Sequence, residues 1–113
     1  MLQNSFSKRA EAFVRSVVKQ RSFLIKSGRS KKPEAEQLGI INFIIKHLDA
    51  YPDRTDKQMA GFWNKNADQF FTLLPGKGSA VHETLTETFY QLNSEAKTLI
   101  VVNLVKPQIP IHY

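Results

Sequence analysis

The chain of 113 residues contains no cysteine, and this absence excludes several classes of protein at once. Without thiols there is no disulfide scaffold, no thiolate zinc site, no cysteine nucleophile and no iron–sulfur cluster. The sequence also has no apolar run approaching the roughly 18 to 20 residues that a membrane span requires. Charged residues interrupt every candidate stretch for a secretory signal. We therefore expect a protein of the cytoplasm with no membrane span.

Acidic residues are scarce in the N-terminal third. Residues 1–32 hold nine Lys and Arg against one acid, Glu11, which is a net charge of +8. Residues 33–113 hold seven basic and nine acidic side chains, a net charge of −2, so that the whole chain carries +6. A polyanion responds to a local field of this kind more than to the overall pI. Such a segment also fits a mitochondrial transit peptide, but its large apolar residues favour a place in the core.

Apolar residues make up 42% of the chain, enough for the core of one domain at this length. They recur at the three- and four-residue spacing of amphipathic helices along most of the sequence. We predict one all-α domain, residues 1–113, with four to five helices. In it, residues 1–32 form a basic amphipathic helix and a basic loop, residues 33–106 form a helical body, and residues 107–113 form an extended tail.

Capping signals mark the expected helix ends. Gly28 is expected to stop the first helix, because glycine readily adopts the left-handed conformation found just after a helix. Thr55 and Gln58 have the spacing of a capping box at the start of the third helix. Ser79 is the expected cap of a fourth helix, and Ser94 belongs to a further start signal that predicts a separate short element after it.

Two apolar segments leave alternatives open. The helix expected over residues 33–50 is apolar around most of its circumference, which indicates either a central place in the bundle or a part in an oligomer interface. Residues 99–105 have no polar face and suit a buried helix or a buried strand. We favour a short helix, because the nearby candidate partner for a strand contains Pro110.

A row of cations is the most specific feature of the first helix. Lys8, Arg15, Lys19 and Lys26 are spaced so that they fall within about 40° of one another around the helix axis, along about 27 Å. The row lies almost opposite the apolar stripe of the same helix. Phosphate backbones bind such rows by counterion release, whatever the base sequence. The candidate nucleic-acid-binding residues are Lys8, Arg9, Arg15, Lys19, Lys26, Arg29, Lys31 and Lys32.

The same charges have other interpretations. The outer face of any amphipathic helix is rich in Lys and Arg, so the row is also consistent with a solvated surface. Docking of an acidic protein or lipid surface is a third, less favoured interpretation. Phe23 lies off the apolar stripe, nearer to Lys19 and Lys26. It either widens the buried face or stacks on an unpaired base, and the buried alternative is the more common.

Other motifs carry little chemistry. The glycines around Lys77 resemble a phosphate-binding loop, but Phe71 stands where that pattern requires glycine. His47, His82 and His112 are far apart in the sequence and have no metal-ligand spacing. The third helix is a poor DNA-recognition helix because Asp56 and Asp68 offset its lysines. We therefore predict no catalytic residue, no metal, no cofactor and no enzymatic activity.

The sequence thus favours a non-enzymatic nucleic-acid-binding protein, a small regulator or accessory factor whose partner is DNA or RNA. The alternative is a protein-interaction module, such as an adaptor, an inhibitor or an assembly subunit, that binds through apolar helical surface. An acidic protein surface is then the partner in place of nucleic acid, and a homodimer is a further outlet for the apolar surface.

Overall fold

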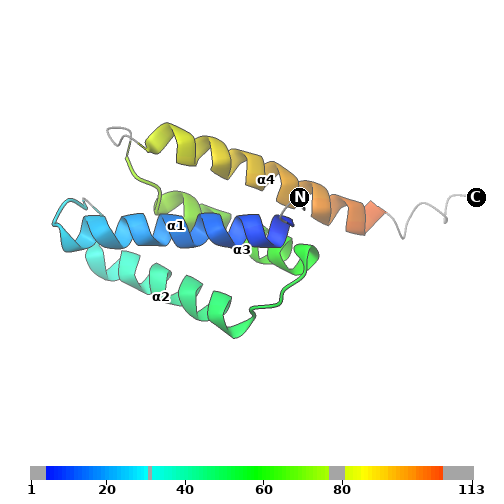
Figure 1. Cartoon of the computed structure of the whole chain (residues 1–113), viewed down its shortest axis with the longest axis horizontal. Helices are drawn as coiled ribbons and strands as arrows, with labels where there is room; N and C mark the ends of the chain where they lie inside the picture. Colours follow the sequence, from blue (N-terminus) through cyan, green and yellow to red (C-terminus); the bar gives the residue numbers. More distant parts are fainter. Residues whose placement is uncertain (1–4, 31, 77–80, 106–113) are drawn as a thin grey trace, which may run out of the picture.

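The computed structural model describes residues 5–30, 32–76 and 81–105, with side chains up to residue 100. Over these residues the chain forms four helices in sequence order and no strand (Figure 1). They are α1 (Phe6–Lys26), α2 (Glu34–Ala50), α3 (Asp56–Thr72) and α4 (His82–Val105). The predicted all-α class is confirmed. The predicted cap at Ser79 and the predicted tail, residues 107–113, lie outside the described residues. None of the four helices is long and apolar enough to cross a membrane.

Helix α1 is capped at both ends, and it ends where the sequence predicts. The Ser5 hydroxyl accepts a hydrogen bond from the Lys8 backbone N–H at 3.3 Å. At the other end Gly28 has φ +73°, the left-handed conformation that glycine adopts at little cost. The Gly28 and Arg29 N–H groups then bond the carbonyls of Ile25 and Leu24, at 3.1 and 2.9 Å. These bonds satisfy carbonyls that the helix itself leaves open.

Helix α3 begins with the predicted capping box. The Gln58 N–H donates to the Thr55 hydroxyl at 3.2 Å, and the Thr55 N–H donates to the Gln58 side-chain oxygen at 2.9 Å. The helix then passes through Gly61 without a break. Its first residue, Asp56, also accepts the Ser7 N–H of α1 at 2.9 Å, which fixes the start of α3 against the start of α1.

Helix α4 is continuous, so the predicted separate element after Ser94 is wrong. The Asn93 side chain accepts a hydrogen bond from the Trp63 indole N–H at 3.2 Å and does not cap a new helix. The buried face of α4 continues past it to Ala96, which is fully buried. Because packing against α3 extends on both sides of the start signal, the chain gains more from continuing the helix than from restarting it. The favoured helical state of residues 99–105 is confirmed.

The core lies between α1, α3 and α4, around the fully buried Trp63. Its ring packs against Phe13 of α1, Phe70 of α3 and Phe89 of α4, with centroids 5.9, 5.1 and 5.5 Å away. Tilted aromatic pairs at these distances stabilise a core beyond the area that they bury. This cluster joins the three helices into one bundle.

Helix α2 lies at the edge of this bundle, so the predicted central position is wrong (Figure 1). Ile41, Ile44 and Leu48 are buried, whereas Leu38 and Phe43 are 41% and 49% exposed. The pattern of apolar residues shows how much of a helix is apolar but not how many helices pack against it. Here α3 and α4 take the central positions beside α1. The oligomer-interface alternative stays a prediction.

Candidate nucleic-acid interface on helix α1

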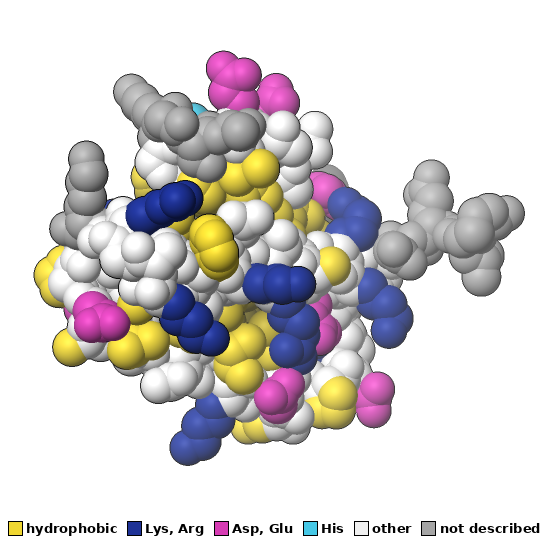
Figure 2. Space-filling model, turned by 60° about the vertical axis from the view of Figure 1, so that its left-hand side comes forward, with side chains coloured by type: hydrophobic (Ala, Val, Ile, Leu, Met, Phe, Trp, Pro, Cys, Tyr) yellow, Lys and Arg dark blue, Asp and Glu magenta, His cyan; other side chains and the backbone are white. Residues whose placement is uncertain are grey.

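Basic side chains gather around α1 and the α1–α2 loop. Figure 2 brings the end of the molecule that carries this loop forward and shows dark blue Lys and Arg side chains across it, with hydrophobic side chains between them. Seven of the eight predicted site residues are described, and Lys31 lies outside the described residues. The seven divide into those held by other groups of the protein and those left open to solvent.

The open set consists of Lys8, Lys19, Lys26 and Arg29. All four are exposed, and their side chains make no hydrogen bond or ion pair with any described residue. Three belong to the predicted row on α1, and Arg29 follows in the loop. Because the described part of the chain offers none of them a partner, each has its charge available for an external anion.

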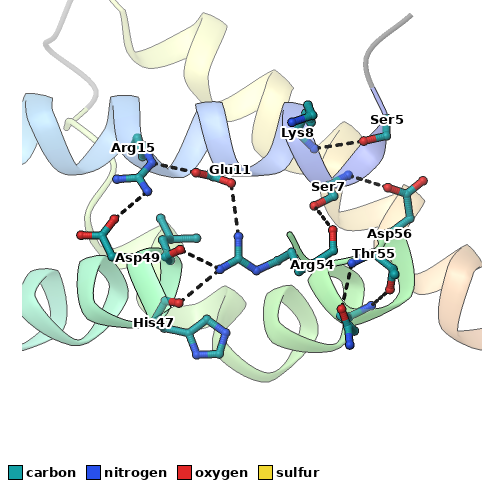
Figure 3. Close-up of polar contacts among 12 residues, drawn as sticks. Ser5, Ser7, Lys8, Glu11, Arg15, His47, Asp49, Arg54, Thr55 and Asp56 are labelled. Atoms are coloured by element: carbon teal, nitrogen blue, oxygen red, sulfur yellow. Dashed lines mark hydrogen bonds and ion pairs between the residues drawn. The ribbon is translucent and has the colours of Figure 1, made fainter. Parts of the chain in front are cut away.

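Arg15, the fourth member of the row, is held by two carboxylates. Its Nε donates to Glu11 and its Nη2 donates to Asp49 of α2, both at 2.9 Å (Figure 3). These bonds raise the pKa of Arg15, the one to Asp49 having the largest effect. The row is therefore not uniform. The charge of its second residue, Arg15, is offset by two carboxylates, and the residue connects α1 to the end of α2.

Arg9 is also held by a carboxylate. Its guanidinium forms a two-point ion pair with Glu95 of α4, at 2.8 and 2.7 Å. The hydrogen bond raises the pKa of Arg9 and lowers the pKa of Glu95. Arg9 thus connects α1 to α4. Because Glu95 offsets its charge, Arg9 attracts an external anion less strongly than a member of the open set does.

Lys32 and Arg21 meet at the end of α3. The Lys32 ammonium donates to the carbonyl of Thr72. Arg21 is only 4% exposed and donates to the carbonyls of Leu73 and Leu74, at 3.1 and 2.6 Å. Burial lowers the pKa of both cations. A cation at a helix C-terminus donates hydrogen bonds to carbonyls that the helix leaves open, and it interacts favourably with the negative end of the helix dipole.

Arg54 plays the same part at the end of α2. Its Nη2 donates to the carbonyls of His47 and Leu48, at 3.2 and 3.1 Å, and its Nη1 donates to Glu11 at 3.2 Å (Figure 3). Neither Arg21 nor Arg54 is predicted from the sequence as a buried structural residue. For Arg21 the signal was present, because it lies four residues after Val17 on the apolar stripe of α1.

Phe23 is exposed, so the prediction that it widens the buried face is wrong. It is 58% exposed, and on α1 it lies four residues after Lys19 and three before Lys26. Residues at these spacings are neighbours on a helix surface. Two of the open cations, Lys19 and Lys26, thus have an aromatic ring beside them, which is the combination that proteins use to bind unpaired bases.

Two of the three imidazoles, those of His47 and His82, have structural neighbours, and His112 lies outside the described residues. His47 stacks on Phe62 with centroids 3.8 Å apart and planes at 1°, and burial together with the charge of Arg54 lowers its pKa. The Nδ1 atom of His82 lies 2.9 Å from the Pro75 carbonyl oxygen. Over the part of the chain that the structure describes, no three His, Asp or Glu side chains come together as a metal site.

Comparisons with protein-family models, curated proteins and solved structures found no match to this chain. The evidence for the candidate interface therefore comes from its own residues. These are the four open cations, the three cations that bond carboxylates or a carbonyl of the protein, and Phe23.

Proposed function

We propose that this chain is a non-enzymatic nucleic-acid-binding protein that contacts the phosphate backbone through the outer face of α1 and the loop after it. The observation that carries the proposal is the open set, Lys8, Lys19, Lys26 and Arg29, together with the exposed ring of Phe23, which neighbours Lys19 and Lys26 on α1. A phosphate that approaches these cations displaces only water and counterions, whose release favours binding.

The contribution of each predicted residue follows from its present partners. Arg9, Arg15 and Lys32 already donate to groups of the protein, so a phosphate has to compete with Glu95, with Asp49 or with a carbonyl. We therefore assign most of the binding to the open set. About four neutralised phosphates predict a slope of about −3 to −4 for log K against log salt on duplex DNA, and about −3 on a single strand.

The test is fluorescence anisotropy with a labelled duplex and a labelled single strand, at salt concentrations from 50 to 200 mM. Over this range a slope of about −3.5 weakens duplex binding by about a hundredfold. The double variant Lys19→Glu and Lys26→Glu should bind at least about tenfold more weakly at low salt, because it reverses two charges of the open set.

The matched control is Lys46→Glu with Lys97→Glu. It makes the same change of net charge at exposed lysines of α2 and α4, whose side chains have no partner among the described residues. The control should change the affinity by less than about threefold. Equal losses in the two double variants would mean that binding follows net charge alone, and no binding by the unaltered protein would end the proposal.

Exposed apolar side chains favour a second candidate, a protein-interaction module. Leu38 and Phe43 lie open on α2, and Phe71 and Tyr90 form an exposed pair across α3 and α4 with centroids 6.3 Å apart. A mass that rises with concentration in sedimentation, in a protein that binds no nucleic acid, would favour this candidate over the first.

A further inference from the structure

A groove of about 570 Å³ separates α2 from α3, and none of the residues that line it belongs to α1. This volume lies within the range of sites that hold small organic molecules. The groove is open to solvent. It is thus separate from the cation row and can be altered without changing that row.

One wall of the groove is aromatic. Phe43, His47 and Tyr51 follow one another at four-residue spacing along α2 and the residue that caps it. Phe43 and Tyr51 are 49% and 60% exposed, and His47 stacks flat on Phe62 between them. The Phe43 ring lies 6.4 Å from Phe62 and the Tyr51 ring 5.0 Å from His47, so the rings form one continuous patch.

The other wall is basic. Lys57, Gly61 and Lys65 follow one another at the same four-residue spacing along α3. Both lysines are exposed, and their side chains have no hydrogen-bond or ion-pair partner among the described residues. A side chain built onto Gly61 would begin in open space, so the glycine leaves a gap between the two cations.

No carboxylate lines this groove among the described residues. Asp53 belongs to an adjoining hollow, which shares Tyr51 and Gln58 with the groove. The guanidinium of Arg54 is paired with Glu11, so the open charge of the groove is that of the two lysines. Aromatic rings and lysine side chains thus line one space of small-molecule size. The ligand that complements both walls has a planar ring and a negative charge, as a nucleotide does.

We propose that the groove takes an unpaired nucleotide of a single strand, with the base against Phe43 and Tyr51 and the phosphates at Lys57 and Lys65. This inference rests on the proposed function and deepens it, because it makes single strands the preferred partner. A duplex cannot use the aromatic wall, since its bases are already stacked and paired. A single strand suits an open groove better than a free nucleotide does, because its flanking phosphates hold the base in place.

The test compares two aromatic double variants by anisotropy with labelled oligouridine and a labelled duplex. Phe43→Ala with Tyr51→Ala removes the exposed rings of the groove. Phe71→Ala with Tyr90→Ala removes an equally exposed pair elsewhere, at 46% and 55% exposure. We expect the groove variant to bind oligouridine about tenfold or more weakly and to bind the duplex within about twofold of the unaltered protein. The control variant should bind both within about twofold.

Photocrosslinking gives a second readout that does not depend on affinity. Oligouridine carrying 4-thiouridine should crosslink to the peptide that contains Tyr51, and the crosslink should be lost in the groove variant. Crosslinks confined to α1, or equal losses of affinity in the two double variants, would overturn the inference and leave the proposed function standing. Failure of the unaltered protein to bind either probe would overturn both.

Adenosine 5′-monophosphate distinguishes the two sources of a nucleotide. We expect millimolar concentrations of it to compete weakly with oligouridine, because it lacks the neighbouring phosphates. If micromolar concentrations displaced oligouridine from the groove, the ligand would be a free nucleotide and the assignment to a single strand would be wrong.

Discussion

Lys19, Arg21 and Lys26 lie close together on α1 and carry the same charge, yet they have opposite surroundings. Arg21 is 4% exposed and donates to two carbonyls at the end of α3, whereas Lys19 and Lys26 are exposed and have no partner among the described residues. Arg21 lies about 200° around the helix from Lys19, so the helical phase separates them. A count of charges treats the three cations alike. Their positions around the helix axis decide which of them satisfies carbonyls inside the fold and which of them face solvent.

Arg54 extends the comparison beyond the N-terminal third. It holds the end of α2 as Arg21 holds the end of α3, through two carbonyls each. Guanidinium groups suit this task because several donors diverge from one planar group. Part of the positive charge of the chain therefore belongs to the interior of the fold, and only the remainder is free to attract a polyanion.

The largest effect on stability is expected from Arg21→Met. The substitution leaves the carbonyls of Leu73 and Leu74 without donors in a buried place, and we expect a loss of about 3 kcal/mol in the free energy of unfolding. Urea denaturation measures it. Lys26→Met is the matched control and should change stability by less than about 0.5 kcal/mol. Similar losses in the two variants would break the distinction between interior and surface cations.

A smaller effect is expected from Lys32→Met at the same end of α3. The Lys32 ammonium donates to the Thr72 carbonyl, but the residue is exposed, so water replaces the lost donor. We expect the variant to be less stable by no more than about 1 kcal/mol in the same urea experiment. A loss as large as that of Arg21→Met would show that the exposed ammonium stabilises this helix end as much as the buried guanidinium does.

The smallest effect is expected from Glu95→Gln, which breaks the exposed pair with Arg9. Because the hydrogen bond from Arg9 lowers the pKa of Glu95 below its ordinary value of 4.5, the pair stabilises the fold above that pH. The stabilisation is lost as the pH falls through the lower pKa of the folded state. At pH 7 we expect a difference of less than about 1 kcal/mol, since both side chains are more than one-third exposed.

Urea denaturation of the unaltered protein and of Glu95→Gln at several pH values measures this contribution. The difference between the two proteins should shrink steadily below about pH 4.5. A difference that did not change between pH 7 and pH 3 would mean that the pair does not contribute through its charge.

Local signals predicted much of the fold. The cap at Thr55, its partner Gln58 and the stop at Gly28 act within one helical turn, so their outcome depends on neighbours in the sequence. The start signal at Ser94 is equally local but was overruled, because Asn93 binds Trp63 and the buried face continues to Ala96. Packing against another helix outweighs a cap when the two conflict.

The sequence predicted which basic residues make up the candidate site, but it did not predict which of them form ion pairs within the protein. Arg15 finds Asp49 and Arg9 finds Glu95, partners that lie 34 and 86 residues away in the sequence. The pattern of one helix contains no information on such contacts. The groove between α2 and α3 was not predicted for the same reason. The residues of each wall recur every four positions in the sequence, but this spacing indicates a groove only once the two helices are known to lie side by side.

The sequence by itself determined the helical class, the main helix ends and the row of cations that faces away from the apolar stripe of α1. These features depend on helical geometry and on contacts within a turn or two. The tertiary structure alone decided which cations are compensated, which helix lies at the edge and which aromatic rings stay exposed. Such outcomes depend on which helix packs against which, because burial and ion pairing are properties of neighbours in space and not of neighbours along the chain.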